Sequence, residues 1–334
     1  MFLIGEEKIN LLQKFYMSEN SKDLYKLFYG NRVIFLCLSV FLITFLYGTT
    51  NLEAKKAAIL KEGSGHFTYK DSGLESTILN NPNDGMTVWY HKPVGSGKDT
   101  PFVFVMHGQS RTAENYRDVW RPFSDEGNFI LIVPEISYEH FPGSRYNLGN
   151  AYTSRGKKKE KSKWIFSILE RLFDELKKQN SLNTEKYDIY GHSAGGQFVH
   201  RLVMFFPEAR FRLAVAANPG WYTMPDLSVD MPYGVANINL DTKHFRKVFS
   251  SRLIVLLGED DDDPFHRSLR KTDEAILQGE HRFARGKNFF KTGKKFAEKY
   301  NFPFKWQQLT VPMVGHSNSG MAQFIHFLIG KPFK

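Results

Sequence analysis

The chain has 334 residues, a formal net charge of +10 and 15% aromatic residues. This length gives one large α/β domain an ample core and leaves residues for additional segments. The single cysteine, Cys37, excludes an intramolecular disulfide. A basic chain suits anionic surfaces or nucleic acid, but no nucleic-acid-binding motif is present, so we expect a solvated basic surface and no nucleic-acid partner.

The first 50 residues contain a short uncharged run from Val33 to Tyr47, preceded by Lys26 and Arg32. About 15 apolar residues are too few for an ordinary spanning helix, but they fit the apolar region of a signal peptide or a short signal anchor. A buried core helix is the alternative. We expect residues 1–50 to direct export and residues 51–64 to form a linker. The folded domain would then occupy residues 65–334 outside the cytoplasm, periplasmic or secreted, either released or tethered to the membrane through residues 33–47.

Apolar runs typical of strands alternate with helix-periodic segments through the folded domain. Continuous apolar runs, such as 101–106, 129–133 and 253–257, are typical of parallel strands buried on both faces. The other predicted strands are 66–69, 86–91, 187–190, 211–217 and 306–311. Helices are predicted over 113–123, 164–180, 198–206, 266–277, 286–300 and 320–329. This alternation predicts an α/β fold with a mostly parallel, doubly wound sheet and helices on both faces.

One sharp turn in this pattern carries a candidate nucleophile. Ser193 lies in the sequence Gly-His-Ser-Ala-Gly, between the predicted strand 187–190 and a run with helical periodicity. A strand–turn–helix context is what the G-x-S-x-G pattern requires if its serine is to project from a strained turn. The N–H groups of the following helix favour developing negative charge. We therefore expect Ser193 to be a catalytic nucleophile.

A serine hydroxyl needs a base within reach and a group that orients the base. Among 11 histidines, His316 is the best placed, because it follows the last predicted strand and lies among small and polar residues. His192 adjoins Ser193, but we expect its side chain to leave the turn in another direction. His107 is expected to support the loop that follows strand 101–106.

The orienting carboxylate is expected after strand 253–257, where residues 259–263 offer several acidic side chains. Asp261 is our choice, and Asp263 is the alternative acid. The EF-hand calcium spacing is not met in this run, so no metal is expected there.

The resulting order, Ser193, Asp261, His316, is the order of α/β-hydrolases. From about residue 85 to the end, the sequence resembles the α/β-hydrolase superfamily. The segments VMHGQSRTAENY and YGHSAGGQF resemble most the poly(3-hydroxybutyrate) depolymerase and feruloyl-esterase branch. The resemblance implies that the backbone N–H groups of Gln109 and Ala194 form the oxyanion hole.

Several segments are candidates for the substrate pocket. Ser110, Trp221 and Tyr222 are predicted to line it, and the aromatic, Gly-rich segment 137–156 is either a pocket wall or an ordinary surface loop. Two arginines, Arg282 and Arg285, either pair with the acidic run 260–263 or bind an anionic part of the substrate.

Together these features predict a serine hydrolase that cleaves a small-molecule or polymeric carboxylic ester through an acyl-enzyme. No metal or organic cofactor is expected. A serine peptidase or amidase on the same fold is the nearer alternative. A hydrolase-like binding protein with an unused triad is the second.

Overall fold

The computed structural model describes residues 59–74 and 85–332. The chain divides into two units, residues 1–55 and 56–334, and every element below belongs to the second unit. The described residues do not include the predicted export segment 1–50, with its apolar run 33–47, or most of the predicted linker. Within the two described ranges, no helix is both long enough and apolar enough to cross a membrane.

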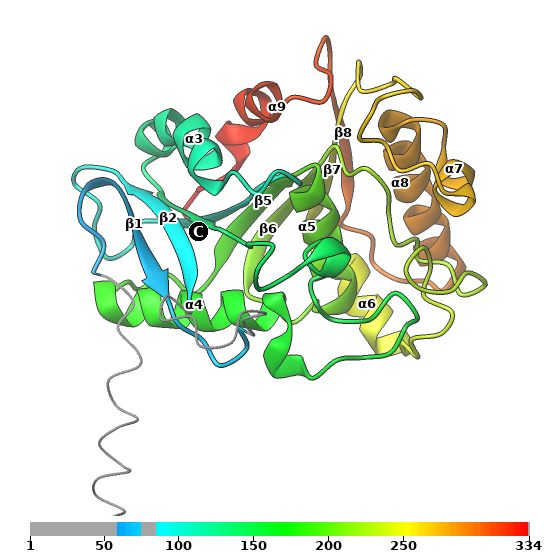
Figure 1. Ribbon diagram of the computed structural model, residues 1–334, viewed down its shortest axis with the longest axis horizontal. Coiled ribbons are helices and arrows are strands. Elements are labelled where there is room, and N and C mark those ends of the chain that lie inside the picture. The colour runs from blue at the N-terminus through cyan, green and yellow to red at the C-terminus, as the bar shows by residue number, and fades with distance from the viewer. Residues whose placement is uncertain (1–58, 75–84, 333–334) are drawn as a thin grey trace, which may run out of the picture. The chain divides into compact units, whose positions relative to one another are not determined.

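Eight strands form one sheet in the order β1-β2-β4-β3-β5-β6-β7-β8 (Figure 1). Their bounds are β1 Gly63–Tyr69, β2 Met86–Lys92, β3 Phe102–Met106, β4 Ile130–Pro134, β5 Tyr187–His192, β6 Phe211–Ala217, β7 Leu253–Gly258 and β8 Gln307–Val311. The β1–β2 and β2–β4 pairs are antiparallel, and all other neighbouring strands are parallel. The predicted mostly parallel sheet is confirmed.

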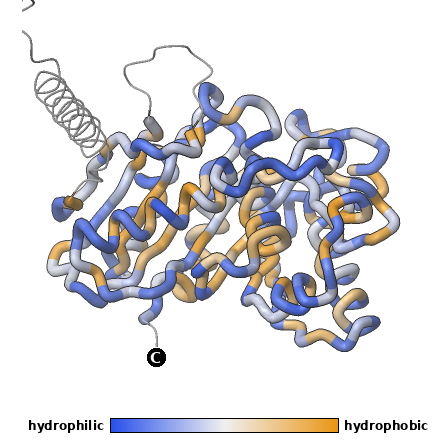
Figure 2. The backbone as a smooth tube through the Cα atoms, turned by 90° about the horizontal axis from the view of Figure 1, so that it is seen from below, coloured by the Kyte–Doolittle hydropathy of each residue, from blue (hydrophilic) through white to orange (hydrophobic). Residues whose placement is uncertain are grey.

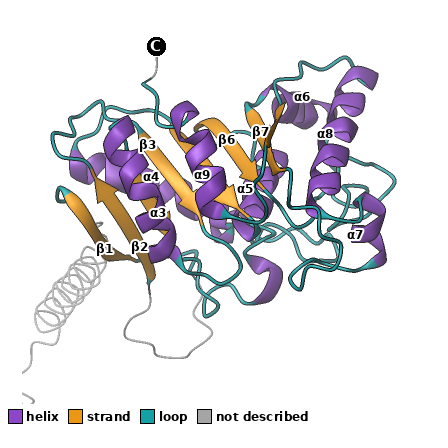
Figure 3. Cartoon of the chain, turned by 90° about the horizontal axis from the view of Figure 1, so that it is seen from above, coloured by secondary structure: helices purple, strands orange, loops and turns teal. Residues whose placement is uncertain are grey.

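Helices cover both faces of this sheet (Figures 1 and 3). The helices on one face are α3 (Ala113–Gly127) and α9 (Asn318–Ile325), whose buried side chains form one apolar cluster with the strands. The other face carries α4 (Ile165–Asn180), α5 (Ala194–Phe205), α6 (Thr242–Ser250) and α8 (Arg282–Lys299), which contribute to a second cluster. The short helix α7 spans Asp273–Gln278. The doubly wound arrangement is therefore confirmed.

Burial along the strands explains their sequence patterns. Every residue of β3, β4, β5 and β7 is buried, because helices lie on both sides of these strands. The edge strand β1 instead alternates between partly buried and exposed positions as far as Thr68, and its last residue, Tyr69, is buried. Figure 2 shows hydrophobic segments running through the interior of the folded unit and hydrophilic segments along its outer loops.

Several predicted boundaries are wrong. Strand β1 begins at Gly63, two residues inside the predicted linker, and α6 was not predicted. Residues 266–272 form turns rather than helix, and α8 begins at Arg282 instead of residue 286. The side chain of Asp241 caps α6 by accepting from the His244 N–H, and that of His281 caps α8 by accepting from the Ala284 N–H. These caps depend on the local geometry of the backbone and side chain, which the periodicity of apolar residues does not predict.

Candidate active site

Ser193 occupies a strained turn between β5 and α5. Its backbone has φ +58° and ψ −112°, a conformation that costs a non-glycine residue about 1–3 kcal/mol. The Ser193 N–H donates to the Ala217 carbonyl at 2.9 Å, which fixes the turn to the end of β6. The turn projects the side chain beyond the carboxyl end of the sheet, where open α/β sheets place their sites.

The glycines around Ser193 are required by close backbone approach. A Cβ atom at Gly195 would lie 2.0 Å from the Met106 carbonyl oxygen, and one at Gly191 would lie 2.2 Å from the Gly195 carbonyl oxygen. Neither position has room for a side chain. The G-x-S-x-G pattern is therefore a packing requirement of this turn.

Three side chains from different strand ends form a hydrogen-bonded row. His316, which follows β8, places Nε2 2.9 Å from Ser193 Oγ and Nδ1 2.7 Å from Oδ2 of Asp261, which follows β7. With its proton on Nδ1, the imidazole donates to Asp261 and accepts the Ser193 hydroxyl proton at Nε2. The structure therefore brings together the three residues predicted from the sequence, in the geometry of a nucleophile, a base and an orienting acid.

The second oxygen of Asp261 contacts a buried arginine. Arg282 donates from Nη1 to Oδ1 at 3.0 Å, and both side chains are almost fully buried. Its Nη2 group donates to Ser268 Oγ at 2.8 Å and approaches His266 Nδ1 at 3.2 Å. Of the two predicted roles for this arginine, pairing with the acidic run is the one these contacts support. Arg285 instead donates to backbone carbonyls and pairs with no carboxylate among the described residues.

The alternative acid lies outside this row. Asp263 is exposed, and its Oδ1 accepts from the Phe265 N–H at 2.8 Å, so it stabilises a surface turn.

His107, predicted to support its loop, is fully buried and bonds at both ring nitrogens, with Nε2 accepting from the Ile136 N–H and Nδ1 donating to the Gly108 carbonyl. The hydroxyl of Tyr116 contacts His192 Nδ1 at 3.1 Å, and the ring centres of His192 and His316 lie 4.7 Å apart.

Comparison with protein-family models and with curated proteins gave no match. Among solved structures, the chain is similar to poly(aspartic acid) hydrolase-1 from Sphingomonas sp. KT-1, with 39% identity over 81% of this chain and 100% of that chain, and a TM-score of 0.75. It is also similar to the poly(3-hydroxybutyrate) depolymerase LpqC from Bordetella parapertussis, with 32% identity over 80% of this chain and 89% of that one, and a TM-score of 0.73.

The chain belongs to the α/β-hydrolase superfamily. The expected resemblance to the depolymerase branch is thereby confirmed, as is the expected fold. Both neighbours are named as hydrolytic enzymes, and this α/β-hydrolase is assigned to the same general class of reaction.

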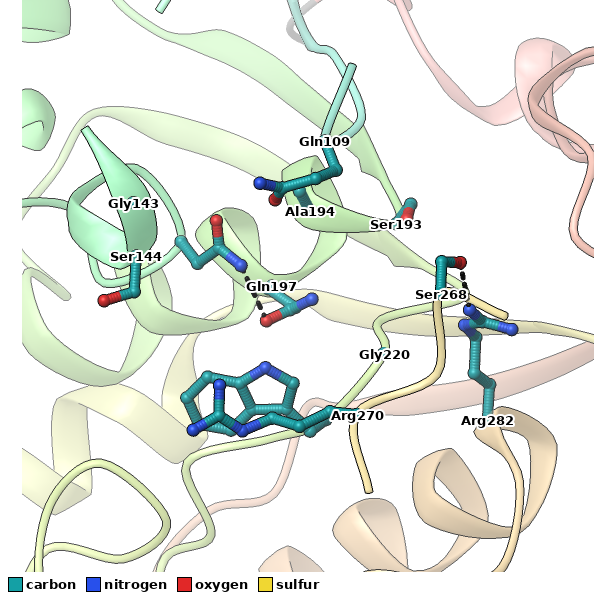
Figure 4. Close-up of a pocket in the computed structure, with 12 residues that line it drawn as sticks. Gln109, Gly143, Ser144, Ser193, Ala194, Gln197, Gly220, Ser268, Arg270 and Arg282 are labelled. Atoms are coloured by element: carbon teal, nitrogen blue, oxygen red, sulfur yellow. Dashed lines mark hydrogen bonds between the residues drawn. The ribbon is translucent and has the colours of Figure 1, made fainter. Parts of the chain in front are cut away.

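The two predicted oxyanion-hole residues, Gln109 and Ala194, lie beside Ser193 (Figure 4). Ala194 is the first residue of α5 and Gln109 follows β3, and both line the same cavity as Ser193. Within the described residues, neither N–H has a protein acceptor, as is usual for the first N–H of a helix. The Gln109 loop is tied down by Tyr138, whose hydroxyl donates to the Gln109 carbonyl at 3.0 Å. These N–H groups are therefore available to a ligand.

The cavity beside Ser193 has a volume of about 350 Å³ (Figure 4). It is lined by Gln109, Gly143, Ser144, Asn147, Ser193, Ala194, Gln197, Gly220, Trp221, Ser268, Arg270 and Arg282. Gly143, Ser144 and Asn147 belong to the segment 137–156, so part of that segment forms a pocket wall. Of the three predicted pocket residues, the structure places Trp221 in this lining.

Two of the pocket predictions are wrong. Tyr222 is fully buried and stacks on Phe289 with ring centroids 4.5 Å apart, because its side chain points to the opposite side of the chain from Trp221. Ser110 is exposed and lies outside the lining of the cavity. The prediction missed Gln197 and Arg270. Gln197 lies four residues after Ser193, one helical turn along α5, and this spacing was a usable signal.

In the described parts of the chain, no group of three or more His, Cys, Asp or Glu side chains is arranged to hold a metal ion.

Proposed function

We propose that this hydrolase cleaves a carboxylic ester through an acyl-enzyme formed on Ser193. The observation that carries the proposal is the continuous row from Ser193 Oγ through both nitrogens of His316 to Asp261. A serine hydroxyl becomes nucleophilic when an adjacent base takes its proton, and an oriented carboxylate stabilises the imidazolium that forms.

In the first half of the reaction, Ser193 Oγ attacks the ester carbonyl carbon while its proton passes to His316 Nε2. The negative charge that develops on the carbonyl oxygen is stabilised by the N–H groups of Gln109 and Ala194. The tetrahedral intermediate collapses, the bond to the alcohol oxygen breaks, and the alcohol leaves with the proton from His316. In the second half, water repeats these steps on the acyl-enzyme, which releases the acid and restores Ser193.

Ser193→Ala tests this mechanism, because it removes the nucleophile and leaves the turn intact. We expect turnover of a p-nitrophenyl ester to fall by about 10⁶-fold, with an unchanged circular dichroism spectrum. A fluorophosphonate probe should label the wild-type protein and not the variant. Labelling also separates an active enzyme from a binding protein with an unused triad. Retention of more than a few per cent of the ester turnover would remove Ser193 from the mechanism.

Amide hydrolysis is the second candidate. Poly(aspartic acid), the polymer named for one neighbour, is a polyamide, whereas poly(3-hydroxybutyrate), named for the other, is a polyester. The acyl-enzyme route serves both bonds, because only the leaving group differs. A p-nitrophenyl ester and a p-nitroanilide of the same acyl group compare the two reactions directly. Nitroaniline is the poorer leaving group, so an esterase should release it far more slowly than it releases nitrophenol. Similar kcat/KM values for the two substrates would favour the amidase.

We further propose that the hydrolase works outside the cytoplasm, periplasmic or secreted, and is either released or tethered through residues 33–47. The support is the uncharged run from Val33 to Tyr47 between Arg32 and Lys55.

A further inference from the structure

The cavity beside Ser193 is polar and carries positive charge. Its lining includes the guanidinium groups of Arg270 and Arg282 together with amide and hydroxyl side chains, and no carboxylate. Small-molecule pockets are usually lined mostly by apolar side chains with a small number of polar groups. A neutral aliphatic acyl group would desolvate these polar groups without offering them hydrogen bonds, which costs free energy.

Arg270 lines the cavity, and its two outer guanidinium nitrogens have no hydrogen-bond partner among the described residues. Its Nε donates to the hydroxyl of Tyr233, and its guanidinium lies 4.8 Å from the ring centre of Trp221 and 5.4 Å from that of Tyr233. Among the described residues, neither Nη group has a hydrogen-bond acceptor. A stacked guanidinium with two free Nη groups is pre-organised to grip a carboxylate with parallel hydrogen bonds.

Among the described residues, no carboxylate forms an ion pair with Arg270 or with the buried arginines Arg201 and Arg285. Arg201 is fully buried against Trp221, donates to Thr223 and two backbone carbonyls, and leaves its Nη2 without a partner. Burial and the nearby charge of Arg270 lower the pKa of Arg201. Arg285 is also fully buried and bonds to carbonyl oxygens. Within the described part of the chain, the only ion pair recorded for these four arginines joins Arg282 to Asp261.

We propose that the substrate carries a carboxylate near the scissile carbonyl and that the free Nη groups of Arg270 bind this carboxylate. The inference rests on the proposed hydrolysis at Ser193 and narrows the substrate to an anionic ester or amide. The positive charge of Arg201, which has no paired carboxylate among the described residues, attracts the anion. The two Nη groups of Arg270 orient it. Binding at both ends of the acyl group would hold the carbonyl in place for attack.

Turnover tests the proposal with two matched substrates. One is a p-nitrophenyl half-ester of a dicarboxylic acid, from glutaric to suberic, with the other carboxylate free; the second has that carboxylate methylated. We expect wild-type kcat/KM to favour the free carboxylate. Arg270→Gln should reduce this preference by about 10- to 100-fold, mainly through a higher KM for the charged substrate. Arg267→Gln removes the same charge from an exposed position in the same segment, outside the cavity lining, and should leave the preference unchanged.

Binding to Ser193→Ala tests the anion site without any need for turnover. Calorimetry with monomethyl adipate should show binding that dimethyl adipate lacks and that the added change Arg270→Gln abolishes. If wild-type protein hydrolyses neither p-nitrophenyl substrate, the proposed hydrolysis fails, and the calorimetry still decides the anion site. The inference would be overturned if both adipates bound equally or if neither bound. It would also be overturned if Arg270→Gln and Arg267→Gln had equal effects on the substrate preference.

Discussion

Arg282 holds one oxygen of Asp261 at 3.0 Å while the other oxygen of that carboxylate holds His316 at 2.7 Å. Both carboxylate oxygens of Asp261 are therefore held by a partner. One of these partners, Arg282, also lines the substrate cavity. Arg282 is the first residue of α8, so the helix positions the acid loop. We regard Arg282 as a positioning residue, since its contact with the proposed base passes through Asp261.

Arg282→Met should impair both the fold and the reaction. Removing one partner of a buried ion pair leaves an uncompensated charge, which lowers the free energy of unfolding by about 3–5 kcal/mol. The displaced Asp261 should reduce kcat by about 10²-fold in protein that remains folded. Thermal melting and ester kinetics measure the two effects. Arg282→Lys keeps the charge and should recover part of kcat, an outcome that loss of packing alone does not predict.

Lys291→Met provides the control, because it makes the same chemical change at an exposed position on the same helix. Its melting temperature and kcat should match those of the wild type. Equal kcat in Arg282→Met and Lys291→Met would show that the arginine does not position the acid.

Asp261→Asn and Asp263→Asn should differ sharply. An amide at position 261 favours the wrong tautomer of His316, a change that costs about 10⁴-fold in kcat in the best-studied triad. Asp263 is exposed and caps a turn, so its amide should cost little. Steady-state kinetics on one ester compares them, and the reverse ranking would transfer the role of the acid to Asp263.

His107 makes stability depend on pH. Burial lowers the pKa of His107 to about 4, against an ordinary value near 6.5. As pH falls from about 6.5 to about 4, the unfolded chain takes up a proton that the folded chain does not, so the free energy of unfolding decreases, by about 3 kcal/mol in total. Burial also lowers the pKa values of His192 and His200, which adds to the loss in the same direction.

His107→Gln should flatten this dependence, because an amide can accept from the Ile136 N–H but does not titrate. Urea unfolding at several pH values between 4 and 7 measures the slope. His66→Gln, at an exposed position on β1, should leave the slope as in the wild type. Identical slopes in the two variants would exclude His107 as a source of the acid sensitivity.

The proposed location can be checked with reporter fusions. An alkaline phosphatase joined after Ala58, just before the first described residue, should be active in a bacterial host, because that reporter needs an oxidising compartment. A β-galactosidase at the same junction should be inactive. The opposite result would mean that residues 33–47 are no export signal.

The sequence predicted the sheet and the strand ends that carry Ser193, Asp261 and His316 because these depend on local patterns. Continuous apolar runs identify the buried strands, and the glycines beside Ser193 are required by contacts within one turn. No local sequence pattern predicts the row of hydrogen bonds that these three residues form. It depends on the relative position of three strand ends.

The cavity was harder to predict because its lining comes from several segments. Trp221 and Tyr222 are neighbours in the sequence, yet one lines the cavity and the other is fully buried against α8. Sequence alone left two roles open for Arg282, and only its contacts with Asp261 and Ser268 separate them. Arg270 carried no signal at all, because it lies in a segment of turns that was predicted to be helical.

Trp221 lies within 4.1 Å of the Arg201 guanidinium and 4.8 Å of the Arg270 guanidinium, measured from the ring centre. The emission of an indole responds to charges this close to its ring. A ligand that draws Arg270 toward itself therefore changes the light that Trp221 emits. Trp221 is one of five tryptophans in the chain, so the fluorescence change expected on occupancy of the cavity is the part of the signal that Trp221→Phe removes.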